Sequence, residues 1–200
     1  WGFAEKAAAA ILAGMPVITK PATSTCLVTE RCIETVVEAD CLPEGVLGLI
    51  CGSVADLFDH LHGQDVVAFT GSADTALKIR SHENLLARST PVNVEADSLN
   101  AAILAPDVEP GSEVWNLFIR EVSREVTQKS GQKCTAVRRI FVPQHQLATV
   151  EEAMCAELSG RVTGSPFDDK TNVGPLATAD QLSSVLDGVK KLRQVADLVH

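Results

Sequence analysis

Short apolar segments alternate with helix-favouring segments through the first 95 residues, and this alternation constrains the fold more than any other feature of the chain. Three apolar runs are typical of buried strands: Val17–Thr19, Val46–Cys51 and Val66–Phe69. Four intervening segments favour helix: residues 3–13 (closed by Gly14), the segment that starts at Cys26, residues 53–62 and residues 73–81. Strands that alternate with helices at this spacing favour a parallel sheet with helices on its faces.

The second of these helices has a candidate N-cap and an apolar face. Ser24 and Thr25 precede it and are residue types that cap helices through their hydroxyls. Its apolar face is predicted to hold Cys26, Ile33, Val36 and Val37.

The pattern changes after Glu95. Residues 101–105 and 139–142 are strand-like, and residues 145–159 favour helix. Between them lies a strongly amphipathic helix with Trp115, Phe118, Ile119, Val122 and Val126 on one side. We therefore place a domain boundary near Glu95, and we expect a ligand-binding cleft at that junction.

Composition and charge exclude several classes of protein. The net charge of −9 argues against a nucleic-acid partner, and no apolar run reaches the roughly 18 residues of a membrane helix. The six cysteines form no CxxC pair, and no histidine stands at zinc-like spacing from them, so we expect no metal site. Reduced thiols in a cytoplasmic protein are the simpler interpretation.

Cys134 is the strongest candidate for chemistry. It lies in the run Ser130–Thr135, beside glycine and lysine, on a predicted loop. A thiol with a carboxylate on a separate element, here Glu95, can act as a nucleophile with its base. The alternative from the residues alone is a small cysteine buried for packing.

Two other segments suit a phosphate or a ribose. Phe69–Ser72 ends a strand and opens a helix, so Gly71 allows a close backbone approach and Ser72 caps a helix N-terminus that favours an anion. An ordinary strand–turn–helix junction would have the same sequence. Lys20 also follows a strand and could reach a ribose hydroxyl or a phosphate, although a lone lysine is usually a solvated charge.

Taken together, the chain resembles the aldehyde dehydrogenase superfamily. The matching motifs occur in the family's order: Ala13–Gly14, Val17–Pro21, Leu42–Val46, Phe69–Ser72, Glu95, Gly131–Cys134 and Gly174–Leu176. A narrower resemblance is to the semialdehyde dehydrogenases of bacterial phenylacetate and benzoate coenzyme A degradation. It is carried by Lys20–Thr23, Phe69–Ala73, Glu95–Asn100 and Ser130–Ala136.

The resemblance implies an α/β fold with a Rossmann-like NAD(P)-binding domain over residues 1–95 and the first part of a catalytic domain over residues 96–200. It implies that Cys134 attacks the aldehyde carbon and that its backbone N–H is one oxyanion donor. Glu95 would activate the water that hydrolyses the thioester and could also deprotonate Cys134. Its presence favours release of a free acid over transfer to coenzyme A.

The cofactor prediction depends on Thr23. Many relatives have a glutamate here that grips the adenosine ribose and repels a 2′-phosphate, and a neutral threonine removes that repulsion. Lys20, Thr23, Gly71 and Ser72 are therefore predicted to bind NADP, with NAD as the alternative. The chain departs from the family where Ala96–Asp97 replace a glycine pair and where Ala76 replaces a glycine.

The predicted substrate is a small aldehyde, with a coenzyme A-linked semialdehyde as the narrower prediction. Two other functions stay open: a coenzyme A-acylating aldehyde dehydrogenase, and a non-catalytic dinucleotide-binding protein that keeps the fold. The chain opens and stops inside helix-like segments, so we expect an internal piece of a longer, homo-oligomeric polypeptide, inactive alone. The resemblance places a second oxyanion donor, an asparagine, before Trp1.

Several charged residues are not assigned to chemistry. His60, His62 and His82 are predicted to be surface groups. Lys133, Arg138 and Arg139 are predicted to be surface or structural charges, with a contact to an anionic substrate as the alternative.

Overall fold

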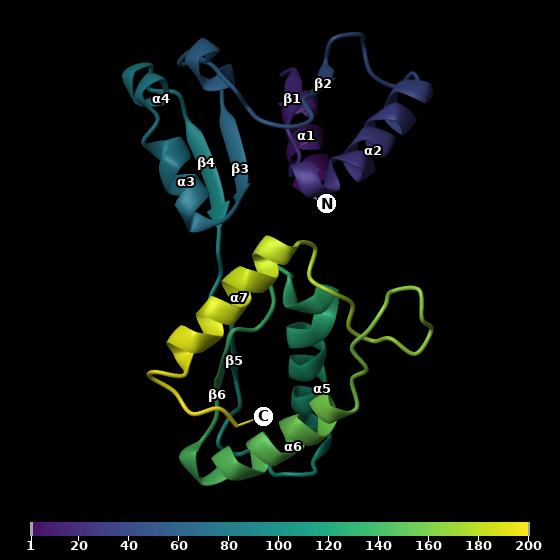
Figure 1. Ribbon diagram of the computed structural model, residues 1–200, viewed down its shortest axis with the longest axis vertical. Helices are drawn as coiled ribbons and strands as arrows, with labels where there is room; N and C mark the ends of the chain where they lie inside the picture. The colour runs from purple at the N-terminus through teal and green to yellow at the C-terminus, as the bar shows by residue number, and fades with distance from the viewer. Residues whose placement is uncertain (1, 200) are drawn as a thin grey trace. The chain divides into compact units, whose positions relative to one another are not determined.

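A computed structural model describes residues 2–199 (Figure 1). The chain forms two compact units, the first ending at Asp97 and the second starting at Ser98. Both contain helices and parallel strand pairs, which confirms the predicted α/β class.

The first unit contains two parallel strand pairs with their connecting helices. Its elements are α1 (Gly2–Leu12), β1 (Val17–Thr19), η1 (Thr23–Thr25), α2 (Cys26–Glu38), β2 (Leu47–Leu49), η2 (Leu57–His60), β3 (Val67–Gly71), α3 (Ala73–Arg80), α4 (Glu83–Ala87) and β4 (Val92–Ala96). β1 pairs with β2 and β3 pairs with β4, both in parallel. Within residues 2–199 these pairs are separate two-stranded sheets, whereas the sequence predicts one sheet.

The prediction of a helix over residues 53–62 is wrong. Only a four-residue 3-10 helix, η2, forms in this segment. Ala55 takes a left-handed φ of 45°, and the hydroxyl of Ser53 accepts a hydrogen bond from the N–H of Ala55 at 3.1 Å. A serine side chain that bonds the nearby backbone competes with helix formation, which explains the interruption.

The predicted cap of α2 is also wrong, although the helix itself is confirmed. Thr23–Thr25 fold into the 3-10 turn η1, and Thr25 makes no side-chain cap bond to α2. The Thr25 hydroxyl donates instead to the carbonyl of Ala22 at 3.4 Å. On the helix, Ile33 is buried, but Val37 is exposed and so does not belong to the packed face.

The second unit is built around a helix pair. Its elements are β5 (Ala101–Ile103), α5 (Glu113–Thr127), η3 (Gln128–Gly131), β6 (Arg139–Phe141), η4 (Gln144–Gln146), α6 (Leu147–Ser159) and α7 (Ala179–Leu192). β5 and β6 pair in parallel, and α5 packs against α6. The buried core consists of Leu104, Trp115, Ile119, Val122, Val150 and Met154.

The amphipathic prediction for α5 is confirmed. Ser112 caps this helix by accepting a hydrogen bond from the N–H of Trp115 at 3.2 Å. The apolar face of α5 is buried in the core, so the helix is a fixed base for the loop that follows it.

Candidate active site

Cys134 lies on the loop that joins α5 to β6. Before it, Lys129, Ser130 and Gly131 have left-handed φ values of 52°, 57° and 75°. Such values are routine for glycine and uncommon for lysine and serine, so the backbone here reverses in an unusual conformation. The Cys134 side chain is exposed and its thiol is free. The structure therefore does not bury this cysteine as a packing residue.

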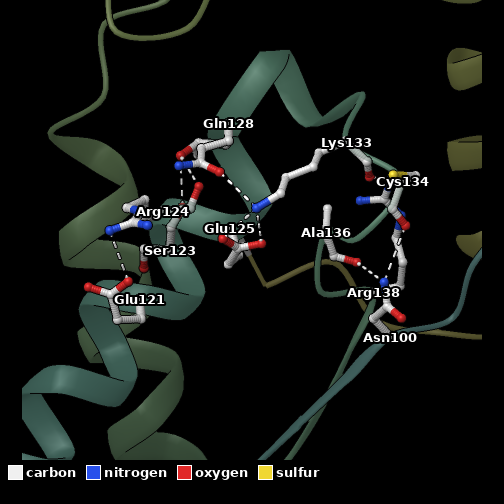
Figure 2. A network of polar contacts seen from close by, with 11 residues as sticks. Asn100, Glu121, Ser123, Arg124, Glu125, Gln128, Lys133, Cys134, Ala136 and Arg138 are labelled. Carbon is white, nitrogen blue, oxygen red and sulfur yellow. Dashed lines mark hydrogen bonds and ion pairs between the residues drawn. The ribbon is translucent and has the colours of Figure 1, made fainter. Parts of the chain in front are cut away.

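The backbone carbonyls around Cys134 are held by side chains from the segment that follows the first unit. The hydroxyl of Ser98 donates to the carbonyl oxygen of Cys134, and Asn100 Nδ2 donates to the same oxygen at 3.2 Å. Asn100 Nδ2 also lies 3.5 Å from the carbonyl oxygen of Ala136, a fully buried residue (Figure 2). In residues 2–199, no acceptor is hydrogen-bonded to the backbone N–H of Cys134.

The residue before the thiol is fixed to α5 by an ion pair. Figure 2 shows the Lys133 side chain extended toward α5, where its Nζ is 2.7 Å from each carboxylate oxygen of Glu125. The same Nζ donates to Gln128 Oε1 at 2.9 Å. Because the three bonds use all three donors of the ammonium, Lys133 is a structural charge.

The loop also contacts one of the family motifs. Gln132 Oε1 accepts a hydrogen bond from the backbone N–H of Ala177 at 3.3 Å. Ala177 directly follows Gly174–Leu176, so this motif is held beside the Cys134 loop.

Glu95 lies on β4 rather than after a strand. In the parallel pair its register partner is Thr70 of β3. Glu95 Oε2 accepts hydrogen bonds from Lys6 Nζ at 3.0 Å and from the Thr70 hydroxyl at 3.1 Å. The Lys6 hydrogen bond, the Thr70 hydrogen bond and the charge of Lys6, in that order, lower the pKa of Glu95 below its usual value. The Glu95 side chain is 60% exposed, so water and these two donors both favour its ionised form.

Lys6 and Asn100 are site residues that sequence reasoning missed. Lys6 lies on an alanine-rich helix, where a lysine is normally a solubilising charge. A weak signal was available, since Glu5 and Lys6 are the only charged residues of α1.

The β3–α3 junction has the predicted helix cap. Ser72 Oγ accepts a hydrogen bond from the N–H of Thr75 at 3.3 Å. A Cβ added to Gly71 would lie 2.5 Å from Cζ of Phe69, so the side-chain-free residue fits the Phe69 ring. The N–H of Ala73, at the start of α3, donates to Asp97 Oδ2 at 3.2 Å, and this carboxylate therefore lies at the helix N-terminus predicted for a phosphate.

Lys20 and Thr23 follow β1. Lys20 is half-buried, and its Nζ donates to the carbonyl of Pro21 at 2.9 Å. Thr23 is exposed and opens η1.

The predicted site residues are thus divided between the two units. Glu95, Gly71 and Ser72 share the carboxyl end of the β3–β4 pair, and Lys20 and Thr23 follow β1, all in the first unit. Cys134 belongs to the second unit.

One histidine assignment is wrong. His82 is not a surface group: it is half-buried, and its ring packs edge-on against Phe58 with 5.4 Å between the ring centroids. His60 is exposed, with Nε2 3.3 Å from Asp56 Oδ2.

No group of three or more histidine, cysteine, aspartate or glutamate side chains in residues 2–199 could hold a metal ion. None of the helices described is long and apolar enough to cross a membrane.

Comparisons with known proteins agree on one family. The sequence model of the aldehyde dehydrogenase family matches residues 2–200. A 3,4-dehydroadipyl-CoA semialdehyde dehydrogenase of Aromatoleum evansii is 47% identical over 199 residues, covering 100% of this chain and 39% of the relative. A geranial dehydrogenase of Castellaniella defragrans is 32% identical over 183 residues, covering 90% of this chain and 36% of the relative. The chain therefore spans about two fifths of the length of these relatives.

Solved structures show the same likeness. A Burkholderia cenocepacia protein assigned to the aldehyde dehydrogenases has a TM-score of 0.82 and 25% identity, over 96% of this chain and 39% of its own. Betaine aldehyde dehydrogenase of Staphylococcus aureus, solved in complex with NAD+, has a TM-score of 0.73 and 26% identity, over 88% of this chain and 34% of its own. The family match extends over the whole described chain. This chain belongs to the aldehyde dehydrogenase family.

Proposed function

We propose that the protein carrying these 200 residues oxidises an aldehyde to a carboxylic acid with a nicotinamide cofactor, using Cys134 as the nucleophile. The observation that carries this proposal is the Cys134 loop. Its thiol is exposed, its carbonyl is held by Ser98 and Asn100, and its N–H is without an acceptor in residues 2–199. A nucleophile next to a free backbone donor is the arrangement that acyl chemistry requires.

In the first half of the reaction, the Cys134 thiolate attacks the aldehyde carbon and forms a carbon–sulfur bond. The carbonyl oxygen becomes an oxyanion, which the N–H of Cys134 stabilises as the charge develops. Hydride leaves this carbon for the cofactor, and the enzyme is left with a thioester on Cys134.

In the second half, Glu95 takes a proton from a water molecule that attacks the thioester. The carbon–sulfur bond breaks, the carboxylic acid leaves and the thiol is restored. The hydrogen bonds from Lys6 and Thr70 lower the pKa of Glu95, so the deprotonated form that accepts the proton persists to lower pH.

The donors of the first unit fit a dinucleotide cofactor. Lys20 offers an ammonium group, Thr23 and Ser72 offer hydroxyls, and these groups suit ribose and phosphate oxygens. Gly71 has no side chain of its own to block a ligand at the β3–α3 junction, where the Phe69 ring lies beside it and the Asp97 carboxylate accepts a hydrogen bond from the N–H of Ala73. When bound, NADP or NAD supplies the hydride acceptor. We therefore assign cofactor binding to residues 1–95 and the thiol chemistry to residues 96–200.

The proposed substrate is a semialdehyde carried on coenzyme A. The support is the 47% identity to a 3,4-dehydroadipyl-CoA semialdehyde dehydrogenase, together with the motifs Lys20–Thr23, Glu95–Asn100 and Ser130–Ala136.

Product analysis tests this function against the alternatives. We expect carboxylic acid to form from aldehyde and NADP without free coenzyme A, and we expect Glu95→Gln to lose acid formation. Turnover that requires free coenzyme A and yields an acyl thioester would instead identify an acylating enzyme. Two outcomes would favour a non-catalytic dinucleotide-binding protein: Cys134 is not labelled by an aldehyde or iodoacetamide, or it is labelled and NADP gives no protection.

A further inference from the structure

The orientation of the proposed oxyanion donor is set by the residue before it. The N–H of Cys134 and the C=O of Lys133 belong to one planar peptide unit, in which the two groups point in opposite directions. A group that holds the Lys133 carbonyl therefore also determines where the Cys134 N–H points.

The Lys133 carbonyl is held twice. It accepts a hydrogen bond from the N–H of Ala136 at 3.1 Å and from Arg138 Nη2 at 3.2 Å. The same Nη2 donates to the carbonyl of Gly131 at 3.1 Å. One guanidinium thus bridges the carbonyls on either side of Gln132, the first of which belongs to the last left-handed residue, Gly131.

Arg138 and Lys133 both carry a positive charge, but they differ in their partners. The Lys133 ammonium is paired with the Glu125 carboxylate, whereas Arg138 has no carboxylate partner in the described part of the chain (Figure 2). Its acceptors are neutral carbonyls, and hydrogen bonds from a charged donor are stronger than those between neutral groups. The Arg138 guanidinium is therefore free of a salt bridge within residues 2–199 and is suited to hold the Lys133–Cys134 peptide through the Lys133 carbonyl.

We propose that Arg138 is a positioning residue: it fixes the Lys133–Cys134 peptide so that the Cys134 N–H faces the developing oxyanion. This inference depends on the proposed function, because it assigns Arg138 a part in the acylation of Cys134. Arg138 touches neither the substrate nor the reacting atoms in this role.

The test compares two reactions of the same thiol in the protein that carries this sequence. Acylation of Cys134 by p-nitrophenyl acetate develops an oxyanion, whereas alkylation by iodoacetamide does not. We expect Arg138→Met to lower the acylation rate and the kcat for aldehyde about 10- to 100-fold, because a misplaced donor loses most of its effect. The alkylation rate should change less than about twofold.

Two further variants complete the design. Arg120→Met removes another exposed arginine, on α5, whose Nε pairs with Glu121 at 3.3 Å, and it should leave both rates unchanged. If Arg138→Met does not fold, Arg138→Lys keeps the charge and should show a smaller loss of acylation, again without loss of alkylation.

The outcomes separate this inference from the proposed function. Equal losses of acylation and alkylation, or no loss of either, would overturn the role of Arg138. Aldehyde oxidation that persists in Cys134→Ala would overturn the proposed function itself. Oxidation that is abolished in Cys134→Ala but unchanged in Arg138→Met would overturn only the positioning role.

Discussion

Glu95 and Cys134 are both exposed, and each is surrounded by hydrogen bonds from its own unit. At Glu95 the donors act on the reactive carboxylate itself, through Lys6 and Thr70. At Cys134 the donors act on the backbone, through Ser98 and Asn100, and the thiol is left free. The proposed base thus has its pKa lowered by its neighbours, whereas the neighbours of the proposed nucleophile hold its carbonyl oxygen and leave its thiol free.

Lys6→Met should change the pH dependence of turnover. Lys6 lowers the pKa of Glu95, so its removal should raise that pKa toward the usual value. A smaller fraction of Glu95 is then ionised at acidic pH, and the acidic limb of the kcat profile should move to higher pH. Arg31→Met, which removes an exposed cation of α2, is the matched control. A limb that stays in place in Lys6→Met would contradict the assigned role of the Lys6–Glu95 pair.

Thr23→Glu should change the cofactor preference. A carboxylate at this exposed position would repel the 2′-phosphate of NADP but not the 2′-hydroxyl of NAD. We expect the ratio of kcat/KM for NADP to that for NAD to fall at least about tenfold, roughly 1.4 kcal/mol. Thr23→Gln, of similar size but neutral, should keep the original ratio. Equal ratios in the two variants would show that position 23 does not discriminate between the cofactors.

Among the elements, α5 determines how the Cys134 loop is held. Its apolar face is fixed in the core by Trp115, Ile119 and Val122, and its last turns present Glu125 to the Lys133 ammonium. The side chains of Glu125 and Lys133 are each 24% exposed, so water screens the pair less than it screens most surface pairs.

Glu125→Gln should loosen this connection. It removes the carboxylate partner of a half-buried ammonium, and we expect a loss of about 1–2 kcal/mol in the free energy of unfolding. A double-mutant cycle with Lys133→Met, measured by urea unfolding, should give a coupling of similar size. Glu121→Gln, which disrupts more exposed pairs with Arg120 and Arg124, should cost less than about 0.5 kcal/mol. Equal costs for the two glutamates would contradict this account of the loop.

Elements with strong local patterns were predictable from the sequence. β1 has the predicted bounds, and α5 was predicted from its apolar periodicity. The helix prediction for residues 53–62 was wrong because the Ser53 hydroxyl and the left-handed Ala55 interrupt a segment whose composition favours helix. Such a local competition between side chain and backbone has no clear signal in hydrophobic periodicity.

The candidate site residues likewise include some that local motifs predicted and some that no local motif predicted. Cys134, Glu95, Gly71 and Ser72 lie in motifs, so their sequence neighbours pointed to them. Asn100 also lies in a motif, but the contacts of Lys6 and Asn100 could not be assigned, because Lys6 meets a residue 89 positions away and Asn100 meets one 34 positions away. Contacts of this range depend on how the strands and helices pack, which no local pattern encodes.

On the scale of the whole molecule, the proposed chemistry is divided between two units. The proposed base and cofactor residues belong to the first, and the nucleophile belongs to the second. All six cysteines are free, so Cys134 must be distinguished from five other thiols in any labelling experiment. Under the proposed function, both units take part in one reaction, in which an acyl group would be held on Cys134 until Glu95 activates water.

The most direct test is therefore to find that acyl group. The protein carrying this sequence, as wild type and as Glu95→Gln, would be incubated with aldehyde and NADP, quenched in acid and digested for peptide mass spectrometry. We predict an acyl adduct on the peptide containing Cys134, abundant in Glu95→Gln and scarce in wild type, and none on the other cysteines. Absence of the adduct from Cys134 in Glu95→Gln, while cofactor is still reduced in the first turnover, would contradict the account.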